Sequence, residues 1–225
     1  MLTDDPGTPG SNKWEINIGW TTQQSPGFAE IGAPQLDLNY GLGDRIELTY
    51  FATYVDDRED GGGSRWGMSD SEFAVKWRFY DGGDHNLQVS AYPEVVFLTP
   101  ASHSDRRGIA DGNTSYALPF QFQRAFEWIS VDVDCGHTFG TGTDADGWFG
   151  GVCVGKELRK GWEIDAEVHV NADEGVDRAE YIGDVATRID LSEKCTLMLL
   201  LGRDLRNQLG PRSSLMSYVG IQLRL

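Results

Sequence analysis

The sequence lacks any apolar run close to the roughly 18 consecutive residues that a membrane-spanning helix needs. Its mean hydropathy is -0.39, and 40% of its residues are hydrophobic. These averages argue against a helical membrane protein. They do not test for spanning strands, because alternating polar and apolar residues cancel in a hydropathy average. The opening residues MLTDDPGTPGSNK contain neither a basic nor an apolar stretch, so they are not a signal peptide, and they leave open whether one was removed.

Basic residues and cysteines are also scarce. The chain has 19 Lys and Arg residues against 35 Asp and Glu residues, which gives a net charge of -16. So acidic a protein repels phosphate groups, which argues against nucleic acid as a partner. The cysteines, Cys135, Cys153 and Cys195, are odd in number and form no paired framework. Local alternation directs Cys135 and Cys153 to opposite faces, so we expect no disulfide between them.

Strict alternation of apolar and polar residues is the dominant pattern. In KWEINIGW (residues 13–20), two tryptophans and two isoleucines fall on one face of an extended chain, and Glu15 and Asn17 fall on the other. The pattern recurs without a convincing helix and predicts about twelve strands of about 9–11 residues, the length of tilted membrane-spanning strands. The predicted strands are residues 13–20, 35–42, 45–55, 71–80, 86–98, 116–124, 128–136, 148–156, 162–172, 180–191, 195–203 and 214–225.

The connections between these strands alternate in length. Short connections are expected at residues 43–44, 81–85, 125–127, 159–161 and 192–194. Mostly longer ones, rich in Gly, Asp, Ser and Arg, are expected at residues 24–34, 56–70, 99–113, 138–147, 173–179 and 204–213. This alternation places the long loops at one end of an up-and-down barrel and both termini at the other, periplasmic end. We divide the chain into a periplasmic N-terminal segment, residues 1–12, and a transmembrane β-barrel, residues 13–225.

The polar faces of the strands carry full charges, and this indicates which face lies inside. On a lipid-facing surface each charge would cost about 2–4 kcal/mol near the bilayer midplane, whereas beside water it costs little. Twelve strands also exceed the roughly eight whose interior is filled by side chains, so the lumen can hold water. The expected lumen-lining residues, a candidate solute path, are Glu15, Asn17, Asp37, Asn39, Glu47, Glu72, Lys76, Arg78, Gln88, Glu94, Gln121, Asp132, Asp134, Glu163, Asp165, Glu167, His169, Asp184, Arg188, Asp190, Gln222 and Arg224.

Tryptophan and tyrosine residues cluster at the strand ends. Their amphipathic rings suit the two membrane–water interfaces, where such residues form girdles. The expected aromatic girdle consists of Trp14, Trp20, Tyr40, Tyr54, Tyr116, Trp148, Trp162 and Tyr181. The fold class that follows is all-β: an up-and-down antiparallel transmembrane β-barrel of about 12 strands.

Three stretches, TDDPGTPG, LDLNYGLGDRIELTY and MSDSEFAVKWRFYDGG, carry a resemblance to a known family. The chain resembles the transporter-like outer-membrane family named for the MetA pathway of phenol degradation, most strongly over residues 3–80. The resemblance implies an outer-membrane β-barrel of a Gram-negative bacterium. It implies no established substrate and supplies no catalytic motif.

Two functions remain open at this point. The first is a channel or transporter for small neutral or cationic solutes, aromatic compounds among them, because carboxylate-lined pores disfavour anions. The alternative is a closed structural or adhesive barrel that binds partners through its extracellular loops. We expect no enzymatic activity, catalytic residues, metal site or cofactor. The expected partners are outer-membrane lipid, lipopolysaccharide and a small solute, and the sequence leaves the oligomeric state open.

Overall fold

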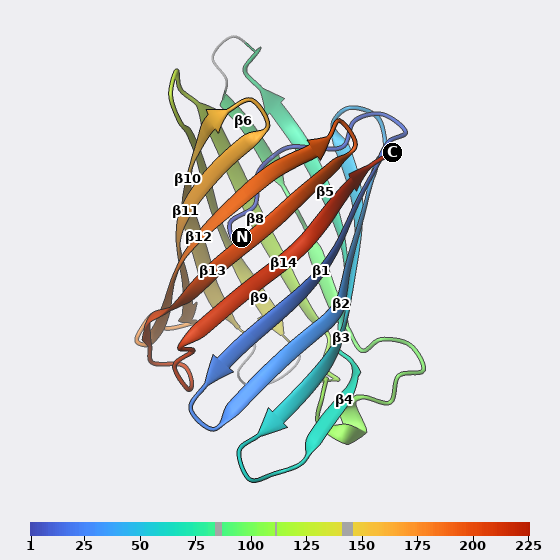
Figure 1. The fold of residues 1–225 in the computed structure, drawn as a ribbon, viewed down its shortest axis with the longest axis vertical. Coiled ribbons are helices and arrows are strands. Elements are labelled where there is room, and N and C mark those ends of the chain that lie inside the picture. The colour runs from blue at the N-terminus through green and yellow to red at the C-terminus, as the bar shows by residue number, and fades with distance from the viewer. Residues whose placement is uncertain (84–86, 111, 141–145) are drawn as a thin grey trace.

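The computed structural model describes residues 1–83, 87–110, 112–140 and 146–225, and these form one antiparallel sheet that closes on itself (Figure 1). Parts of four predicted elements lie outside the described residues: residue 86 of the strand 86–98, and residues 84–85, 111 and 141–145 of the connections 81–85, 99–113 and 138–147. No helix within the described ranges is long and apolar enough to cross a membrane. The strands are β1 (Trp14–Ser25), β2 (Phe28–Gly41), β3 (Ile46–Glu59), β4 (Ser64–Met68), β5 (Ser71–Asp81), β6 (Leu87–Ala91), β7 (Glu94–Phe97), β8 (Ser115–Ala125), β9 (Ser130–Gly140), β10 (Gly147–Arg159), β11 (Trp162–Asp173), β12 (Ala179–Ser192), β13 (Cys195–Asn207) and β14 (Leu215–Arg224).

Fourteen strands make twelve segments of wall, because two segments are interrupted. Both β4 and β5 pair with β3. Strand β5 pairs with the first half of β3, and β4 pairs with its second half. Likewise, β6 and β7 both lie between β5 and β8. The second interruption contains Pro93, which has no N–H to donate to a neighbouring strand. The predicted closed antiparallel barrel of about 12 strands is therefore confirmed.

The barrel closes through the pairing of its first and last strands, which are far apart in sequence. Strand β1 pairs with β14 along ten registered positions, from Glu15 opposite Arg224 to Gln24 opposite Leu215. The β3–β5 pairing, between strands that are close in sequence, continues the wall past the short strand β4. A closed ring leaves no long sheet edge unpaired, so the backbone donors and acceptors of the wall are satisfied within it.

Several connections are shorter than the sequence predicts, because the strands continue into the Gly- and Asp-rich stretches. The expectation of a long connection over residues 24–34 is wrong: β1 runs to Ser25, β2 starts at Phe28, and a two-residue turn joins them. Similarly, the expected connection over residues 56–70 contains the end of β3, a short turn and all of β4. The register of β2 against its neighbours shifts next to Ala33 and Pro34, and this bulge breaks the alternation that would reveal the strand.

One connection in the described part of the chain is long. Residues 98–110 and 112–114 lie between β7 and β8 and contain the 3₁₀ helix η2 (Asp105–Arg107). Figure 1 shows η2 beside the β3–β4 hairpin, at the end of the barrel opposite to the C-terminus. Arg107 links η2 to the β3–β4 hairpin, because its guanidinium donates a hydrogen bond to the carbonyl oxygen of Trp66 at 3.0 Å. The expected long loop at residues 99–113 is therefore present at one end of the barrel.

The N-terminal segment, residues 1–12, enters the barrel. In Figure 1 the chain starts near the middle of the barrel and runs to the end that carries the C-terminus, where β1 begins. Thr3 is 4% exposed and is hydrogen-bonded to the wall. Asn12 donates to the carbonyl oxygen of Gly41 at 2.9 Å as the segment reaches the rim. The sequence analysis separated residues 1–12 from the barrel and did not predict that they enter the lumen. Their periplasmic location stays a prediction.

Candidate functional site

The candidate site is the inner face of the barrel, where the strand register gathers the polar side chains. Directly opposed residues share a face, and the registered pairs run around the ring, with register shifts in the β1–β2, β2–β3, β5–β6, β10–β11 and β12–β13 pairings. For example, Glu47 pairs with Lys76, and Ser90 pairs with Gln121. The same face includes every predicted lumen residue: Glu15, Asn17, Asp37, Asn39, Glu47, Glu72, Lys76, Arg78, Gln88, Glu94, Gln121, Asp132, Asp134, Glu163, Asp165, Glu167, His169, Asp184, Arg188, Asp190, Gln222 and Arg224.

Burial distinguishes this inner face from the outer one. The inner side chains Asp165, Gln121 and Lys76 belong to residues that are 1%, 1% and 4% exposed. On the outer face, Trp77 and Val185 are 55% and 54% exposed, although they are large and apolar. The molecule therefore covers its charged groups and exposes its apolar ones, which is the reverse of a water-soluble protein.

The N-terminal segment is anchored first on β11. The carboxylate of Glu167 accepts three hydrogen bonds through Oε1: from the backbone N–H of Leu2 at 3.1 Å, and from the N–H and hydroxyl of Thr3 at 2.6 and 2.8 Å. Glu167 is 4% exposed, so water contributes little to its solvation and these donors take over that role. This contact fixes residues 2–3 against one side of the lumen.

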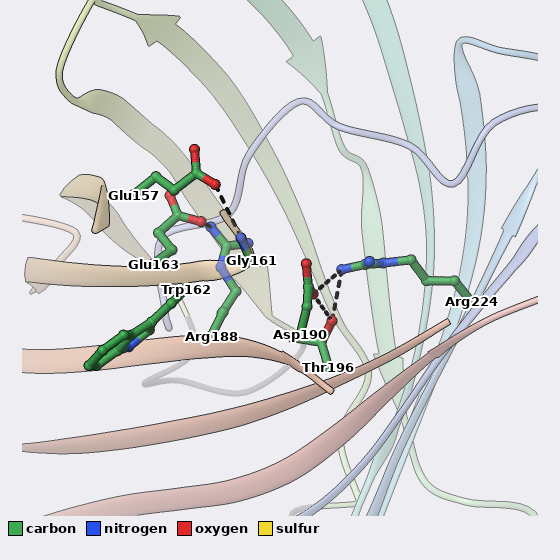
Figure 2. Close-up of a pocket in the computed structure, with 8 residues that line it drawn as sticks. All are labelled: Glu157, Gly161, Trp162, Glu163, Arg188, Asp190, Thr196 and Arg224. Carbon is green, nitrogen blue, oxygen red and sulfur yellow. Dashed lines mark hydrogen bonds and ion pairs between the residues drawn. The ribbon is translucent and has the colours of Figure 1, made fainter. Parts of the chain in front are cut away.

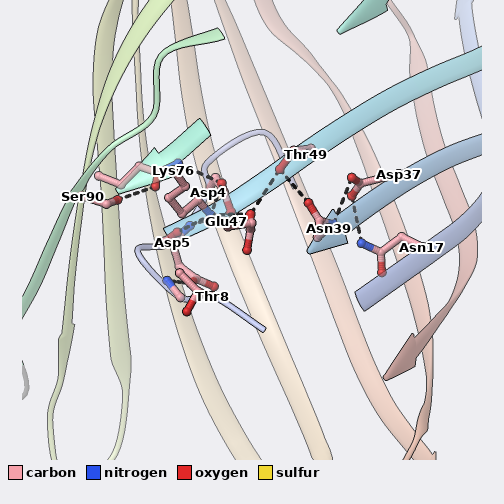
Figure 3. Close-up of polar contacts among 12 residues, drawn as sticks. Asp4, Asp5, Thr8, Asn17, Asp37, Asn39, Glu47, Thr49, Lys76 and Ser90 are labelled. Atoms are coloured by element: carbon pink, nitrogen blue, oxygen red, sulfur yellow. Dashed lines mark hydrogen bonds and ion pairs between the residues drawn. The ribbon is translucent and has the colours of Figure 1, made fainter. Parts of the chain in front are cut away.

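A second anchor lies on β5 and β8 (Figure 3). Lys76 Nζ is 2.7 Å from Asp4 Oδ2 and donates to the carbonyl oxygen of Asp5 at 2.8 Å. The amide of Gln121 donates to the same Asp4 oxygen at 2.8 Å. Because this anchor and the Glu167 anchor lie on different strands, residues 2–5 cross the lumen and narrow it.

Lys76 also ends a chain of polar contacts that crosses β1, β2 and β3 (Figure 3). Its ammonium lies 3.6 Å from Glu47 Oε1. From Glu47 the contacts continue along the inner face through Thr49 and Asn39 to Asp37 and Asn17, at 3.3, 2.8, 3.0 and 2.9 Å in that order. This chain satisfies side chains that would otherwise be buried without partners, and it links the segment to three further strands.

Two glycines in the wall make room for the segment. A Cβ atom at Gly41 would collide with the carbonyl oxygen of Gly10, where the segment passes the rim. A Cβ atom at Gly151 would collide with the Thr3 hydroxyl and lie 2.9 Å from His169 Nδ1. The wall therefore fits the segment at its rim and at its deepest anchor.

A cavity of about 270 Å³ opens at the end of the barrel that carries the short turns (Figure 2). Two of its three acids are paired with arginines. Arg188 Nη2 lies 2.8 Å from Glu163 Oε2, and Arg224 Nη2 donates to Thr196 Oγ1 at 3.0 Å and lies 3.7 Å from Asp190 Oδ1. The third acid, Glu157, accepts a hydrogen bond from the backbone N–H of Gly161. The cavity is lined by Glu157, Gly161, Trp162, Glu163, Arg188, Asp190, Thr196 and Arg224.

Farther into the lumen, the acids are not compensated in this way. We define the acidic patch as Asp132, Asp134, Asp165, Glu167 and Asp184, on β9, β11 and β12. Glu167 stands directly opposite Asp184, and like charges in such a position repel. Two cations of the chain act on the patch: Arg188, whose Nε is 3.7 Å from Asp165 Oδ2, and the N-terminal ammonium, which acts on Asp165 and Asp184. Five carboxyl groups against two cations leave this part of the lumen with an excess of acidic groups.

The predicted girdle residues lie on the outer face. Six of them are within two residues of a strand end, whereas Trp20 and Tyr54 lie well inside β1 and β3. Trp14 stacks at a tilt on Tyr40, with 4.8 Å between ring centroids, and Tyr54 lies 6.1 Å from Trp66. The indole N–H of Trp162 donates to Thr187 Oγ1 at 2.9 Å. Exposed rings also include Trp20, Tyr116, Trp148 and Tyr181, and three tryptophans outside the predicted girdle, Trp66, Trp77 and Trp128.

Some site residues were missed by the sequence analysis because they have no alternating pattern around them. Thr3, Asp4 and Asp5 lie in a Pro- and Gly-containing stretch that reads as a loop. Asp204, 1% exposed, lies in the part of β13 that we expected to be a connection. A pair of adjacent acids in an otherwise small-residue segment, TDDPG, is the one signal that could have suggested a polar anchor.

The structure offers little for metal or covalent chemistry. Within the described residues, no group of three or more His, Cys, Asp or Glu side chains could hold a metal ion. Cys135 is exposed and Cys153 is buried, and both are free. The outward ring of His137 lies between Phe139 and Trp148, at centroid distances of 4.4 and 4.6 Å. These residues pack with their neighbours and form no catalytic constellation.

Comparison with known proteins gives matches in structure alone. No family model matches the sequence, and no curated protein matches it. The crystal structure of an outer membrane channel from Pseudomonas putida F1 matches with a TM-score of 0.78 and 15% identity, over 100% of both chains. The NanC porin matches with a TM-score of 0.65 and 8% identity, over 93% of this chain and 100% of the porin. The KdgM porin in complex with disordered oligogalacturonate matches with a TM-score of 0.62 and 10% identity, over 92% and 98%. At these identities the likeness shows a shared fold, the closed 12-stranded barrel.

Proposed function

We propose that this protein is an outer-membrane channel that passes small neutral or cationic solutes, aromatic compounds among them, through an acidic lumen. The observation that carries the proposal is the division of the wall into a charged inner face and an apolar outer face. Moving apolar surface out of water is favourable by about 25 cal/mol per Å². Exposed side chains such as those of Trp77, Val185 and Leu201 therefore favour a bilayer around the barrel.

The barrel fits a bacterial outer membrane in its dimensions and surface. Its uninterrupted strands have 10–14 residues, against the 9–11 or so that cross a bilayer at a tilt of about 45°. Outer-membrane barrels have short turns and both termini on the periplasmic side. We therefore orient the turns at residues 160–161 and 193–194 toward the periplasm. Outer-membrane lipid and lipopolysaccharide would then contact the outer face.

The solute class follows from the lumen charge. Carboxylate-rich pores attract cations and disfavour anions. The acidic patch, Asp132, Asp134, Asp165, Glu167 and Asp184, is the strongest source of that field. Oligogalacturonate, the molecule in the KdgM porin complex, is itself a polyanion. For this chain we infer solutes without negative charge. The proposal assigns no enzymatic activity to the protein.

A second function is favoured by the path of the N-terminal segment. Residues 2–5 are bonded to β11 on one side and to β5 and β8 on the other. If these contacts persist, the lumen stays closed, and the protein is a structural or adhesive barrel that binds partners through loops such as residues 98–114. The two functions differ in one property, the passage of ions.

Planar-bilayer recording tests the proposal. The purified protein is inserted under a KCl gradient, beside a variant in which residues 2–8 are deleted. For a channel we expect discrete current steps and a reversal potential that indicates a preference for K⁺, with larger steps after the deletion.

Two results would count against an open channel. Stable insertion without current, before and after the deletion, would favour the closed loop-binding barrel. A reversal potential that indicates a preference for Cl⁻ would contradict the acidic-lumen mechanism while leaving a channel in place.

A further inference from the structure

Two arginines on β13 face outward, toward the surface that a bilayer would cover. Arg203 pairs with Gly183, and Arg206 pairs with Tyr181. Both partners belong to the outer face of β12, because they stand opposite the outward Val168 and Val170 of β11. Both arginines are exposed. An arginine on the lipid side is costly near the bilayer midplane and much less so near the interfaces, so such residues favour an interface or an anionic partner.

Neither arginine has an anionic partner in the part of the chain that the structure describes. No carboxylate there forms an ion pair with Arg203 or Arg206. The outward arginine of β3 differs in this respect, since Arg58 Nη2 lies 2.7 Å from Asp56 Oδ2. The two guanidinium groups on β13 therefore keep their charge and their N–H donors available to a molecule outside the barrel.

Both arginines lie toward the end of the barrel opposite to the C-terminus (Figure 1). Strand β13 ends at Asn207, one residue after Arg206. Gly202 pairs with Met216, so Arg203 is level with the start of β14. At a rise of about 3.4 Å per residue and a tilt of about 45°, the backbone of Arg203 lies roughly 10 Å below the end of β13. Because arginine side chains extend toward the interface, both guanidinium groups can reach headgroup level.

An apolar hollow adjoins Arg203 on the outer face. It has a volume of about 450 Å³, and its lining on this face includes Gly183, Val185, Leu201, Arg203 and Leu215. Gly183 contributes no side chain, which leaves space between its neighbours. Glu167 and Asp184 also border the hollow, but the register places their side chains on the inner face of the wall. The outer surface therefore combines two cations with an apolar depression, which is complementary to a lipid with an anionic headgroup.

We propose that Arg203 and Arg206 bind a phosphate group of a phosphorylated glycolipid, the membrane anchor of lipopolysaccharide, and that one of its acyl chains occupies the hollow. Guanidinium groups suit this headgroup because they donate bidentate, charge-assisted hydrogen bonds to phosphate oxygens. The site rests on the proposed function, since it requires an outer membrane with this end of the barrel facing outward. It deepens that function by naming the residues that hold one lipid.

Native mass spectrometry of the detergent-solubilised protein tests this site. The protein is titrated with bisphosphorylated lipid A and with two controls, dephosphorylated lipid A and phosphatidylglycerol. We expect one lipid A molecule to bind at least tenfold more tightly than either control. Equal binding of a control, or displacement of lipid A by an equal concentration of inorganic phosphate, would overturn the proposal. A lipid-free dimer that is lost when both arginines are replaced would assign this face to a second copy of the chain and would also overturn it.

Variants locate the site. We expect Arg203→Gln combined with Arg206→Gln to weaken lipid A binding at least tenfold. Both side chains are exposed, so their replacement leaves the packing of the wall intact. Arg124→Gln removes an exposed, outward arginine at the other end of the barrel, on β8, and is the matched control. Unchanged binding in the double variant, or an equal loss in Arg124→Gln, would overturn the assignment. The wild-type comparison of lipids stays decisive if the double variant does not fold.

The titration separates this inference from the channel proposal, because it requires no current. Selective binding of lipid A without conductance would retain the lipid site and reject the channel. Conductance without selective binding would retain the channel and reject the lipid site.

Discussion

Lys76 Nζ lies 2.7 Å from Asp4 Oδ2, and this ion pair joins the N-terminal segment to the far side of the lumen from Glu167. The lysine side chain is 5% exposed, whereas that of Asp4 is 46% exposed. Glu47 Oε1 also lies 3.6 Å from the ammonium and belongs to the wall, so it does not depend on the segment. Removing the Asp4 carboxylate therefore leaves the buried ammonium of Lys76 with a second carboxylate nearby. This makes the ion pair suitable for mutagenesis.

Asp4→Asn should loosen the segment and increase single-channel conductance. A hydrogen bond to a charged group contributes about 1.5–3 kcal/mol, and the exposure of Asp4 places the loss toward the lower end. Asp60→Asn, in the turn between β3 and β4, removes the same charge away from the lumen and should leave conductance unchanged. Identical step sizes in wild type and Asp4→Asn would show that this ion pair does not limit the current.

Gly151→Leu should displace the segment from its deepest anchor. The new side chain would occupy the position of the Thr3 hydroxyl and approach Asp134 Oδ1, which lies 3.0 Å from a Cβ at this residue. We expect residues 1–12 to become sensitive to added protease in detergent. Val152→Leu, one residue along on the outer face, is the control and should leave the segment protected. Full protection in Gly151→Leu would contradict the observed path.

Val185→Arg should destabilise the protein in a bilayer by about 2–4 kcal/mol, the cost of an arginine on the lipid side near the midplane. Val185 is 54% exposed on the outer face of β12. Gln222→Arg introduces the same residue on the inner face of β14 and should cost much less. Urea unfolding from lipid vesicles measures both. A similar loss in the two variants would contradict the assignment of faces.

Glu157→Lys should reduce the preference for cations. The residue lines the cavity at the short-turn end, where its Oε1 accepts a hydrogen bond from the backbone N–H of Gly161 at 3.2 Å. Interactions of exposed charges contribute about 0.2–1 kcal/mol, so we expect a modest shift of the reversal potential toward that of Cl⁻. Repeating the measurement in 1 M KCl should diminish the difference, because salt screens exposed charges. An unchanged reversal potential would place this cavity outside the ion path.

Alternation in the sequence predicted the wall well because a strand has a side-chain period of two. WEIDAEVHVNA (162–172) places charged and polar residues on every second position, and the structure places them inside on β11. The choice of face also followed from the sequence, since outward charges would cost free energy in lipid. Strand ends were less well predicted: Gly and Asp suppress the pattern in β2, β3 and β13, and the bulge at residues 33–34 shifts it.

The path of residues 1–12 and the meeting of Glu167 with Asp184 were decided by the tertiary structure. Residues 1–12 have no periodicity, and they bind only where Lys76, Gln121 and Glu167, on separate strands, are brought around them. The second depends on the register of β11 against β12, in which a slip of one residue would turn one of the two outward. The sequence by itself thus determined the alternation of polar and apolar faces along each strand, and with it the all-β barrel. Closure of the ring decided which of them meet, because contacts between distant strands depend on register rather than on local pattern.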